Sequence, residues 1–267
     1  MEKIGLIAGN KKFPLLFAQA AKKRNYALVA VAIKGDTSRK LKEYVDKIYW
    51  LSLCEFSRMF EFFKSEGISK IVMAGQISPH RLFSKEVEQD AQLKSLLSNI
   101  QDKKADSIFK EVAAQLEHAG FELLDSTTFM EELLPHKGTL TKREPSFAEW
   151  EDIYFGLKLA KEVAFLDIGQ TVAVKKKAVV AVEALEGTDN LILRAGKISR
   201  GGITVVKVSR PKQDMRFDIP VVGLSTVKNL VKAGACCLAI EADKTIFIDQ
   251  PSSVALAERK GISIVAV

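Results

Sequence analysis

Cysteine and histidine are scarce in this sequence, and neither residue type is arranged as a metal site. The chain has three cysteines and three histidines among 267 residues. Cys236 and Cys237 are adjacent inside an apolar run, where buried free thiols are ordinary. His80, His118 and His136 lie far apart, and no Cys/His spacing resembles a zinc site. The odd cysteine count suits a reducing cytoplasm rather than a disulfide-stabilised fold.

Long apolar runs are also absent. No run reaches the roughly 18 residues that a membrane-spanning helix needs. Met1-Glu2-Lys3 leads directly into a strand-like segment, which does not resemble a secretory signal. A hydrophobic fraction of 47% and a charged fraction of 27% are typical of a folded globular chain. We therefore expect a cytoplasmic protein with one large domain or two domains of ordinary size.

The net charge is positive, +7 with a pI near 9.2. Such a balance favours anionic partners, namely a phosphorylated substrate or an anionic membrane surface. No DNA- or RNA-binding motif is present, so we expect no nucleic-acid partner. The one dense basic group, Lys175 to Lys177, lies between two apolar strand-like runs and indicates a hairpin turn.

The order of apolar segments predicts an α/β protein. In the first half, buried strand-like segments that end at Gly9 and Gly75 alternate with helical patterns, which is typical of a parallel, Rossmann-like sheet. In the second half the lysine turn requires an antiparallel pair, so a mixed sheet is expected there. We predict domains over residues 1–134 and 147–267, with a linker over 135–146. A helix is expected over Phe147–Phe165, capped by Ser146.

The first strand argues against a dinucleotide site. Gly9 is followed by Asn10, Lys11 and Lys12, so the later glycines of the G-x-G-x-x-G fingerprint are missing. Ligands of parallel α/β sheets bind at the carboxyl ends of the strands. A loop of this composition at a strand end still suits a phosphate or a nucleobase.

A polar cluster interrupts two strand-like runs in the stretch 207–226. Its members are Gln213, Asp214, Arg216 and Asp218. The flanking runs are Ile203–Val208 and Ile219–Leu224, so Asp218 is expected where the second strand begins. A carboxylate at a strand end beside basic residues suits a phosphate-handling site. A solvated loop with weak surface ion pairs explains the same composition and stays open.

A second cluster, Glu183 to Asp189, combines carboxylates with a glycine and a helix start. Backbone N–H groups at that helix start would favour a phosphate. Glu186 or Asp189 could hold a magnesium ion, which takes oxygen ligands. The alternative is that Thr188 only caps the helix and Glu183 is an exposed strand residue.

These motifs together resemble the LpxI-type UDP-2,3-diacylglucosamine pyrophosphatases, a family of bacterial lipid A synthesis. The matching segments come in the family's order along essentially the whole chain: Gly5 to Gly9 with Pro14, Ala74 to Ser78, Asp167 to Gln170, Ala181 to Asp189, Gln213 to Pro220 with Gly223, and Ala233-Gly234 with Glu241-Ala242. The combination of E-G-T-D and Q-D-x-R-F-D-x-P is specific. The resemblance implies two α/β domains with the active site between them.

The resemblance also implies a reaction, a cofactor and partners. The reaction is hydrolysis of the pyrophosphate bond of UDP-2,3-diacylglucosamine to UMP and 2,3-diacylglucosamine 1-phosphate (lipid X). A divalent cation, Mg²⁺ or Mn²⁺, would assist the attack of water. A diacylated substrate implies transient contact with the inner leaflet of the membrane, and a homo-oligomer stays open.

The family's essential aspartate corresponds to Asp218, which would orient or deprotonate the water or bind the metal. The remaining catalytic candidates are Asp189 and Glu186, with Asp218 and Asp189 as candidate metal ligands. The candidate substrate-binding residues are Gly9, Asn10, Gly75, Gln76, Asp106, Thr188, Lys207, Gln213, Asp214 and Arg216. The family's glycine-rich first turn is replaced by Asn10 to Lys12, and its Lys-Gly-Asp-Asp segment by Lys103 to Asp106.

Two alternatives to this function remain. One is a pyrophosphatase for another nucleotide diphosphate that carries no acyl chains. The other is a regulatory protein that binds UDP without catalysis. Both would keep the nucleotide-binding residues, and only the second would tolerate loss of the Asp218 carboxylate without effect.

Overall fold

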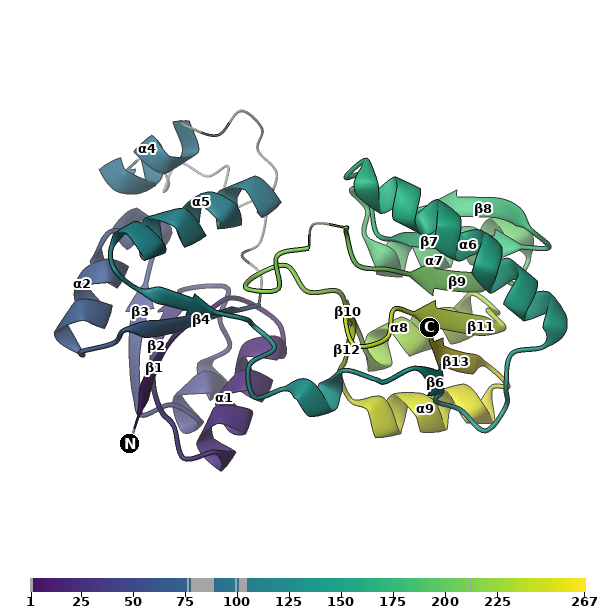
Figure 1. Ribbon diagram of the computed structural model, residues 1–267, viewed down its shortest axis with the longest axis horizontal. Helices are drawn as coiled ribbons and strands as arrows, with labels where there is room; N and C mark the ends of the chain where they lie inside the picture. The colour runs from purple at the N-terminus through teal and green to yellow at the C-terminus, as the bar shows by residue number, and fades with distance from the viewer. Residues whose placement is uncertain (1, 76, 78–88, 99, 101–104, 212) are drawn as a thin grey trace. The chain divides into compact units, whose positions relative to one another are not determined.

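The computed structural model describes residues 2–75, 77, 89–98, 100, 105–211 and 213–267 (Figure 1). For residues 105 and 106 only the backbone is described. The predicted substrate contact Gln76 therefore lies outside the described residues. The chain forms two units: residues 1–131 with 214–218, and residues 132–213 with 219–267. The chain passes from one unit to the other after Glu131, after Gln213 and after Asp218.

Unit 1 contains the first parallel sheet and its helices. Its described elements are β1 Lys3–Ala8, α1 Phe13–Lys23, β2 Ala27–Ile33, η1 Arg39–Glu43, β3 Lys47–Leu51, η2 Leu53–Glu55, α2 Arg58–Ser65, β4 Lys70–Ala74, α4 Ala91–Ser98, α5 Ala105–His118, β5 Glu122–Leu124 and η4 Glu131–Leu133, the last of which continues into unit 2.

The sheet of unit 1 is parallel throughout, in the order β3-β2-β1-β4-β5. One face packs against α2, α4 and α5 in a cluster around Phe63, Leu96 and Leu116. Helix α1, which buries Phe17, contacts β2 and β4. Parallel strands need crossover connections, so the alternation of strands and helices along the chain predicts this parallel arrangement. The predicted Rossmann-like parallel sheet is confirmed.

Unit 2 contains a mixed sheet and its helices. Its described elements are β6 Gly138–Thr139, α6 Phe147–Phe165, β7 Thr171–Lys175, β8 Ala178–Val182, α7 Thr188–Ser199, β9 Thr204–Lys207, β10 Val221–Val222, α8 Leu224–Lys232, β11 Cys237–Ile240, β12 Ile246–Phe247, α9 Gln250–Arg259 and β13 Ser263–Ala266.

The main sheet of unit 2 has the order β6-β13-β11-β9-β7-β8. Strands β13, β11 and β9 are parallel, whereas β6, β7 and β8 each pair antiparallel with their neighbours. Lys176 and Lys177 form the β7–β8 turn, both at positive φ. The predicted lysine hairpin and mixed sheet are therefore confirmed.

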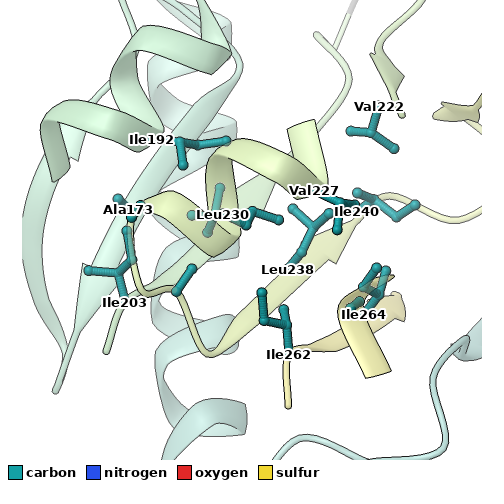
Figure 2. Packing of buried hydrophobic residues seen from close by; sticks show 14 of the residues in the cluster. Ala173, Ile192, Ile203, Val222, Val227, Leu230, Leu238, Ile240, Ile262 and Ile264 are labelled. Carbon is teal, nitrogen blue, oxygen red and sulfur yellow. The ribbon is translucent and has the colours of Figure 1, made fainter. Parts of the chain in front are cut away.

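Hydrophobic clusters cover both faces of this sheet. Helix α6 packs on one face around Ile153, Val174 and Val206, and Gly156 lets it approach so closely that a Cβ there would meet Val206 at 2.7 Å. On the other face α7, α8 and α9 pack on the sheet. Figure 2 shows this second layer, in which Leu230 of α8 lies against the side chains of the sheet.

Helix α6 begins and ends where the sequence predicts. Ser146 accepts a hydrogen bond from the Glu149 N–H, and the Glu149 carboxylate accepts one from the Ser146 N–H. This reciprocal capping box satisfies two N–H groups that a helix start would leave unpaired. No helix among the described residues is long and apolar enough to cross a membrane.

The segment predicted as a linker, 135–146, lies within unit 2. Its β6 pairs with β13, and the Arg143 guanidinium donates to the Cys236 carbonyl at 2.6 Å and to Glu149. These hydrogen bonds and this strand pairing fasten the segment to the sheet and to α6.

Candidate active site

The Q-D-x-R-F-D segment is the first part of the candidate site, and the structure places it differently from the sequence prediction. Residues 214–218 belong to unit 1, although both of their neighbours in the chain belong to unit 2. The strand expected over Ile219–Leu224 is only Val221–Val222, which pairs with β12. The prediction that Asp218 opens this strand is therefore wrong, because residues 214–218 are drawn away by contacts with unit 1.

Ser126, two residues after the end of β5, anchors the segment. Its N–H donates to the Met215 carbonyl at 2.9 Å, and its hydroxyl lies 2.6 Å from the Arg216 carbonyl. The same hydroxyl also contacts the Met73 carbonyl of β4. The segment is thus fixed beside the carboxyl ends of β4 and β5, the edge of a parallel sheet where ligands bind.

Side chains reinforce this docking. The Arg216 guanidinium donates to Asp214 at 2.9 and 2.7 Å and pairs with Glu117 of α5. The hydrogen bond from Arg216 lowers the pKa of the Asp214 carboxyl. Phe217 stacks on Phe109 of α5, with ring centroids 6.1 Å apart. Arg216 and Asp214, predicted as substrate contacts, thus neutralise each other here and shape the loop.

Asp218 ends this turn. Its N–H donates to the Asp214 carbonyl at 2.9 Å, and the residue is half-buried. Because the backbone of 214–218 is anchored on Ser126, the Asp218 carboxylate is carried by a fixed loop of unit 1. Phe217 packs against the hydrophobic cluster of unit 1.

The nucleotide-side candidates of unit 1 meet at the same sheet edge. The Gly9 N–H donates to the Ala74 carbonyl at 2.8 Å, which joins the ends of β1 and β4. Gly75 has φ +85°, and a Cβ there would lie 2.6 Å from the Asn10 carbonyl oxygen. Only glycine fits this contact. The structure thus brings Gly9, Asn10 and Gly75 together. Asp106 lies in α5, but its side chain is outside the described set.

Unit 2 carries a second polar cluster, built from the ends of β8 and β9 and the start of α7. The buried Lys207 ammonium donates to the Thr188 hydroxyl at 2.7 Å, and that hydroxyl donates to the Glu183 carboxylate at 2.8 Å. Gly187, at φ +79°, turns the chain into α7. A lysine, a hydroxyl and a helix start together form a site suited to a phosphate oxygen.

Glu183 belongs to the cluster that the sequence singled out, but it was not among the candidate site residues. It is 9% exposed and also accepts a hydrogen bond from the Gln170 N–H at 3.2 Å. The alternative interpretation of Glu183 as an exposed strand residue is therefore wrong. A carboxylate directly after the apolar run of β8 was the signal that could have identified it, since buried carboxylates require partners. The Gln170 side chain continues the network to the predicted contact Gln213 at 3.4 Å.

The two remaining acidic candidates lie at the start of α7. The Glu186 carboxylate pairs with Arg194, and this contact lowers its pKa. The Asp189 carboxylate accepts a hydrogen bond from the Ser225 hydroxyl at 3.2 Å, which ties the start of α7 to the start of α8. Among the described residues, no three acidic, histidine or cysteine side chains converge as a metal site.

A further carboxylate, Glu241, fixes the chain where it leaves β9 toward residue 214. It accepts hydrogen bonds from the Ser209 N–H at 2.8 Å, from Lys161 at 2.6 Å and from Lys244 at 2.8 Å. Burial alone would raise its pKa. The hydrogen bonds from Lys161, Lys244 and Ser209 outweigh that effect and lower the pKa to about 2.

This contact predicts a pH-dependent contribution to stability. A lowered folded-state pKa stabilises the fold above the unfolded pKa, near 4.5, and the stabilisation is lost as pH falls toward 2. At neutral pH we expect Glu241→Gln to lower the free energy of unfolding by about 1–3 kcal/mol. As pH falls from 5 to 3, the difference in free energy of unfolding between wild type and Glu241→Gln should shrink steadily, by roughly half.

The measurement is urea unfolding followed by Trp150 fluorescence in a Trp50→Phe background, which reports on unit 2 alone because the chain has two tryptophans. Glu162→Gln, at an exposed position of α6, is the control. A difference between Glu241→Gln and wild type that stays constant over this pH range would contradict the prediction.

Comparison with known proteins agrees with this two-unit organisation. Residues 3–133 match the LpxI N-terminal domain, and residues 136–265 match the LpxI C-terminal domain. A relative from Caulobacter vibrioides, named UDP-2,3-diacylglucosamine pyrophosphatase LpxI, is 29% identical over 277 residues, covering 100% of this chain and 98% of the relative.

Similarity to solved structures is weak by contrast. The biotin carboxylase domain of Hydrogenobacter thermophilus 2-oxoglutarate carboxylase is 13% identical, covers 67% of this chain and 36% of that one, and has a TM-score of 0.28. Glycinamide-RNase-transformylase T from Mycobacterium tuberculosis is 12% identical, with 69% and 44% covered and a TM-score of 0.24. Neither supports an argument about this chain, whereas the two domain matches span nearly all of it. The chain belongs to the LpxI family.

Proposed function

We propose that this chain hydrolyses the pyrophosphate bond of UDP-2,3-diacylglucosamine, giving UMP and 2,3-diacylglucosamine 1-phosphate. The observation that carries the proposal is the match of both LpxI domains along the chain, together with a full-length relative that bears this activity in its name. The two polar clusters supply groups of the kind such a reaction needs.

Hydrolysis of a pyrophosphate requires neutralisation of its charge, a positioned water and stabilisation of the leaving phosphate. Lys207 and the start of α7 offer a cation and N–H donors to phosphate oxygens, with Thr188 held in place by Glu183. Asp218 is the candidate to orient or deprotonate the water. Ser126 fixes the backbone of its loop at Met215 and Arg216, which supports this role.

The central test compares wild type with Asp218→Asn in hydrolysis of UDP-2,3-diacylglucosamine in water enriched in heavy oxygen. The amide keeps the size of the side chain and removes the charge and the basic oxygen, so we expect a loss of at least about a hundredfold in kcat. The labelled product identifies the phosphorus atom that water attacks.

Asp243→Asn, at an exposed aspartate bonded to His136, serves as the matched control and should retain activity. A wild type that binds UDP but turns over neither this substrate nor simpler UDP-sugars would be a binding protein instead. Turnover of UDP-sugars without acyl chains at an equal rate would indicate a different pyrophosphatase.

A divalent cation is the second element of the proposal. The described residues do not form a metal site by themselves, and Asp218 and Asp189 belong to different units. Magnesium is commonly held by one or two carboxylates together with substrate phosphates, so we expect the cation to bind with the substrate rather than before it.

This expectation is checked by titrating Mn²⁺ into the protein and following the free ion by electron paramagnetic resonance. We expect binding to wild type to tighten by at least about tenfold when UDP is added, because UDP supplies phosphate oxygens and lacks the acylated sugar that the reaction releases. In wild type, chelation with EDTA should abolish turnover, and Mg²⁺ or Mn²⁺ should restore it. Full turnover in excess EDTA would show that no cation is needed.

A transient inner-leaflet contact and a cytoplasmic location complete the proposal. The substrate carries two acyl chains, and the net charge of +7 favours an anionic surface. We expect cosedimentation with phosphatidylglycerol vesicles that weakens as salt rises from about 50 to 500 mM, because screening shortens the reach of surface charge. Phosphatidylcholine vesicles are the control. Binding that is equal on both lipids and insensitive to salt would contradict the electrostatic contact.

A further inference from the structure

The loop between α6 and β7 contains the sequence D-I-G-Q, residues 167–170, to which the proposed reaction assigns no role. Its start is fixed by the end of α6. The Asp167 N–H donates to the Ala164 carbonyl at 3.2 Å, and the Ile168 N–H donates to the Val163 carbonyl at 3.1 Å. Asp167 itself has φ 57°. A left-handed residue with these two hydrogen bonds forms a Schellman motif, so the D-I-G-Q loop leaves α6 in one defined direction.

The D-I-G-Q loop lies directly against the residue that follows β8. A Cβ at Gly169 would lie 2.2 Å from the Glu183 carbonyl oxygen, so a larger residue would displace one of the two chains. The Gln170 N–H donates to one oxygen of the Glu183 carboxylate at 3.2 Å, and Thr188 donates to the other at 2.8 Å. Lys207 in turn donates to Thr188. The loop thus holds the carboxylate on which the unit 2 cluster depends.

The same loop holds the chain where it leaves β9. The Val208 N–H donates to the Gln170 carbonyl at 2.9 Å, and Arg210 Nε lies 3.1 Å from the Asp167 carboxylate. The Gln170 side-chain amide donates to Gln213 at 3.4 Å. Gln213 is the last residue of unit 2 before the chain passes to unit 1. Three positions of this segment are therefore fastened to one loop.

The direction of the hydrogen bond between the two glutamines is fixed by a third group. Gln213 Oε1 accepts a hydrogen bond from the Arg210 N–H at 2.6 Å. The same oxygen is the partner of Gln170 Nε2. A side-chain amide accepts through its oxygen and donates only through its nitrogen, so the side chain at position 170 must supply a donor here.

We propose that Gln170 is a positioning residue for the proposed hydrolysis, on which this assignment rests. Its main chain holds Glu183, and through it Thr188 and Lys207, whereas its side chain holds Gln213. The last three are expected substrate contacts, and Gln170 acts through them rather than by touching substrate. One loop thereby sets both the polar cluster of unit 2 and the end of the segment that leads to unit 1.

The first test compares kcat/KM for UDP-2,3-diacylglucosamine between wild type and variants at position 170. Gln170→Met keeps the length of the side chain and removes the donor. We expect it to lose roughly three- to tenfold, the range that corresponds to one net hydrogen bond. Gln170→Glu presents an acceptor to the Gln213 oxygen and should lose more than Gln170→Met. A side chain that only fills space would leave Gln170→Met at the wild-type rate.

A double-mutant cycle with Gln213→Ala identifies the partner. Once the Gln213 amide is removed, Gln170→Met should lower kcat/KM by less than about twofold further, because residues that act through a shared contact are not additive. Gln92→Ala is the matched control. Gln92 of α4 donates to Gln115 of α5 at 3.2 Å, which is the same kind of bond in unit 1, and its loss should leave the activity unchanged.

Gly169→Ala tests the main-chain contact. The added methyl group would meet the Glu183 carbonyl, so we expect displacement of Glu183 and a loss of kcat/KM of at least about tenfold. In a Thr188→Val background, where Glu183 has lost its link to Lys207, the same change should cost less than about threefold further. Circular dichroism checks that each variant is folded, and the cycle between the two glutamines decides the proposal if Gly169→Ala is not.

Amide hydrogen exchange reports on the loop without turnover. The Arg210 N–H is bonded to Gln213 Oε1, so loosening Gln213 should speed exchange of this amide. We expect at least about a threefold increase in the exchange rate in Gln170→Met and no change in Gln92→Ala, measured by nuclear magnetic resonance on the full chain.

Two results would overturn the proposal. The first is a Gln170→Met variant with wild-type kcat/KM and an unchanged Arg210 exchange rate. The second is a cycle in which the losses of Gln170→Met and Gln213→Ala are additive, which would mean that Gln170 acts elsewhere. A wild type that hydrolyses no UDP compound would instead overturn the proposed function, and the Arg210 exchange rate would then still show whether the loop holds Gln213.

Discussion

The docking of residues 214–218 on unit 1 is the constraint on which the candidate site depends. Ser126 holds the backbone of Met215 and Arg216 through its N–H and its hydroxyl. These are buried polar groups, and breaking such bonds leaves donors or acceptors unsatisfied at a cost of about 1–3 kcal/mol each. The salt bridges of Arg216 add to the docking, although part of this side chain is solvent-exposed and screened. The position of Asp218 follows from these contacts.

This docking determines which partners compensate the positive charge of Arg216 near Asp218. From composition alone, Arg216 appears as a phosphate ligand beside a catalytic acid. In the structure it is bound by Asp214 and Glu117, so its charge is already compensated. Lys207 is a buried cation of unit 2, with Thr188 as its hydrogen-bond partner. Residues 214–218 thus carry an acid and a docking arginine in unit 1, whereas strand β9 carries a buried lysine in unit 2.

Burial explains why the side chains of the unit 2 cluster are hydrogen-bonded to one another. Glu183 and Lys207 are both buried, and isolated buried charges are expensive unless they are hydrogen-bonded. Thr188 lies between them, accepting from the lysine and donating to the carboxylate. Because each partner requires the others, this network fixes the start of α7 before any ligand binds. Glu241 performs the same function for the chain leaving β9.

The sequence alone determined the parallel sheet of unit 1, the lysine hairpin, the capped helix α6 and the candidate residues Asp218, Thr188 and Lys207. Periodicity, caps and turns depend on residues a few positions apart, so they can be read locally. Only the tertiary structure decided that residues 214–218 join unit 1, that β6 within 135–146 pairs with the sheet of unit 2, and that Glu183 is buried. The partner of Arg216, Ser126, lies ninety positions earlier in the chain. No local pattern specifies a contact over that separation, because it depends on how unit 1 folds as a whole.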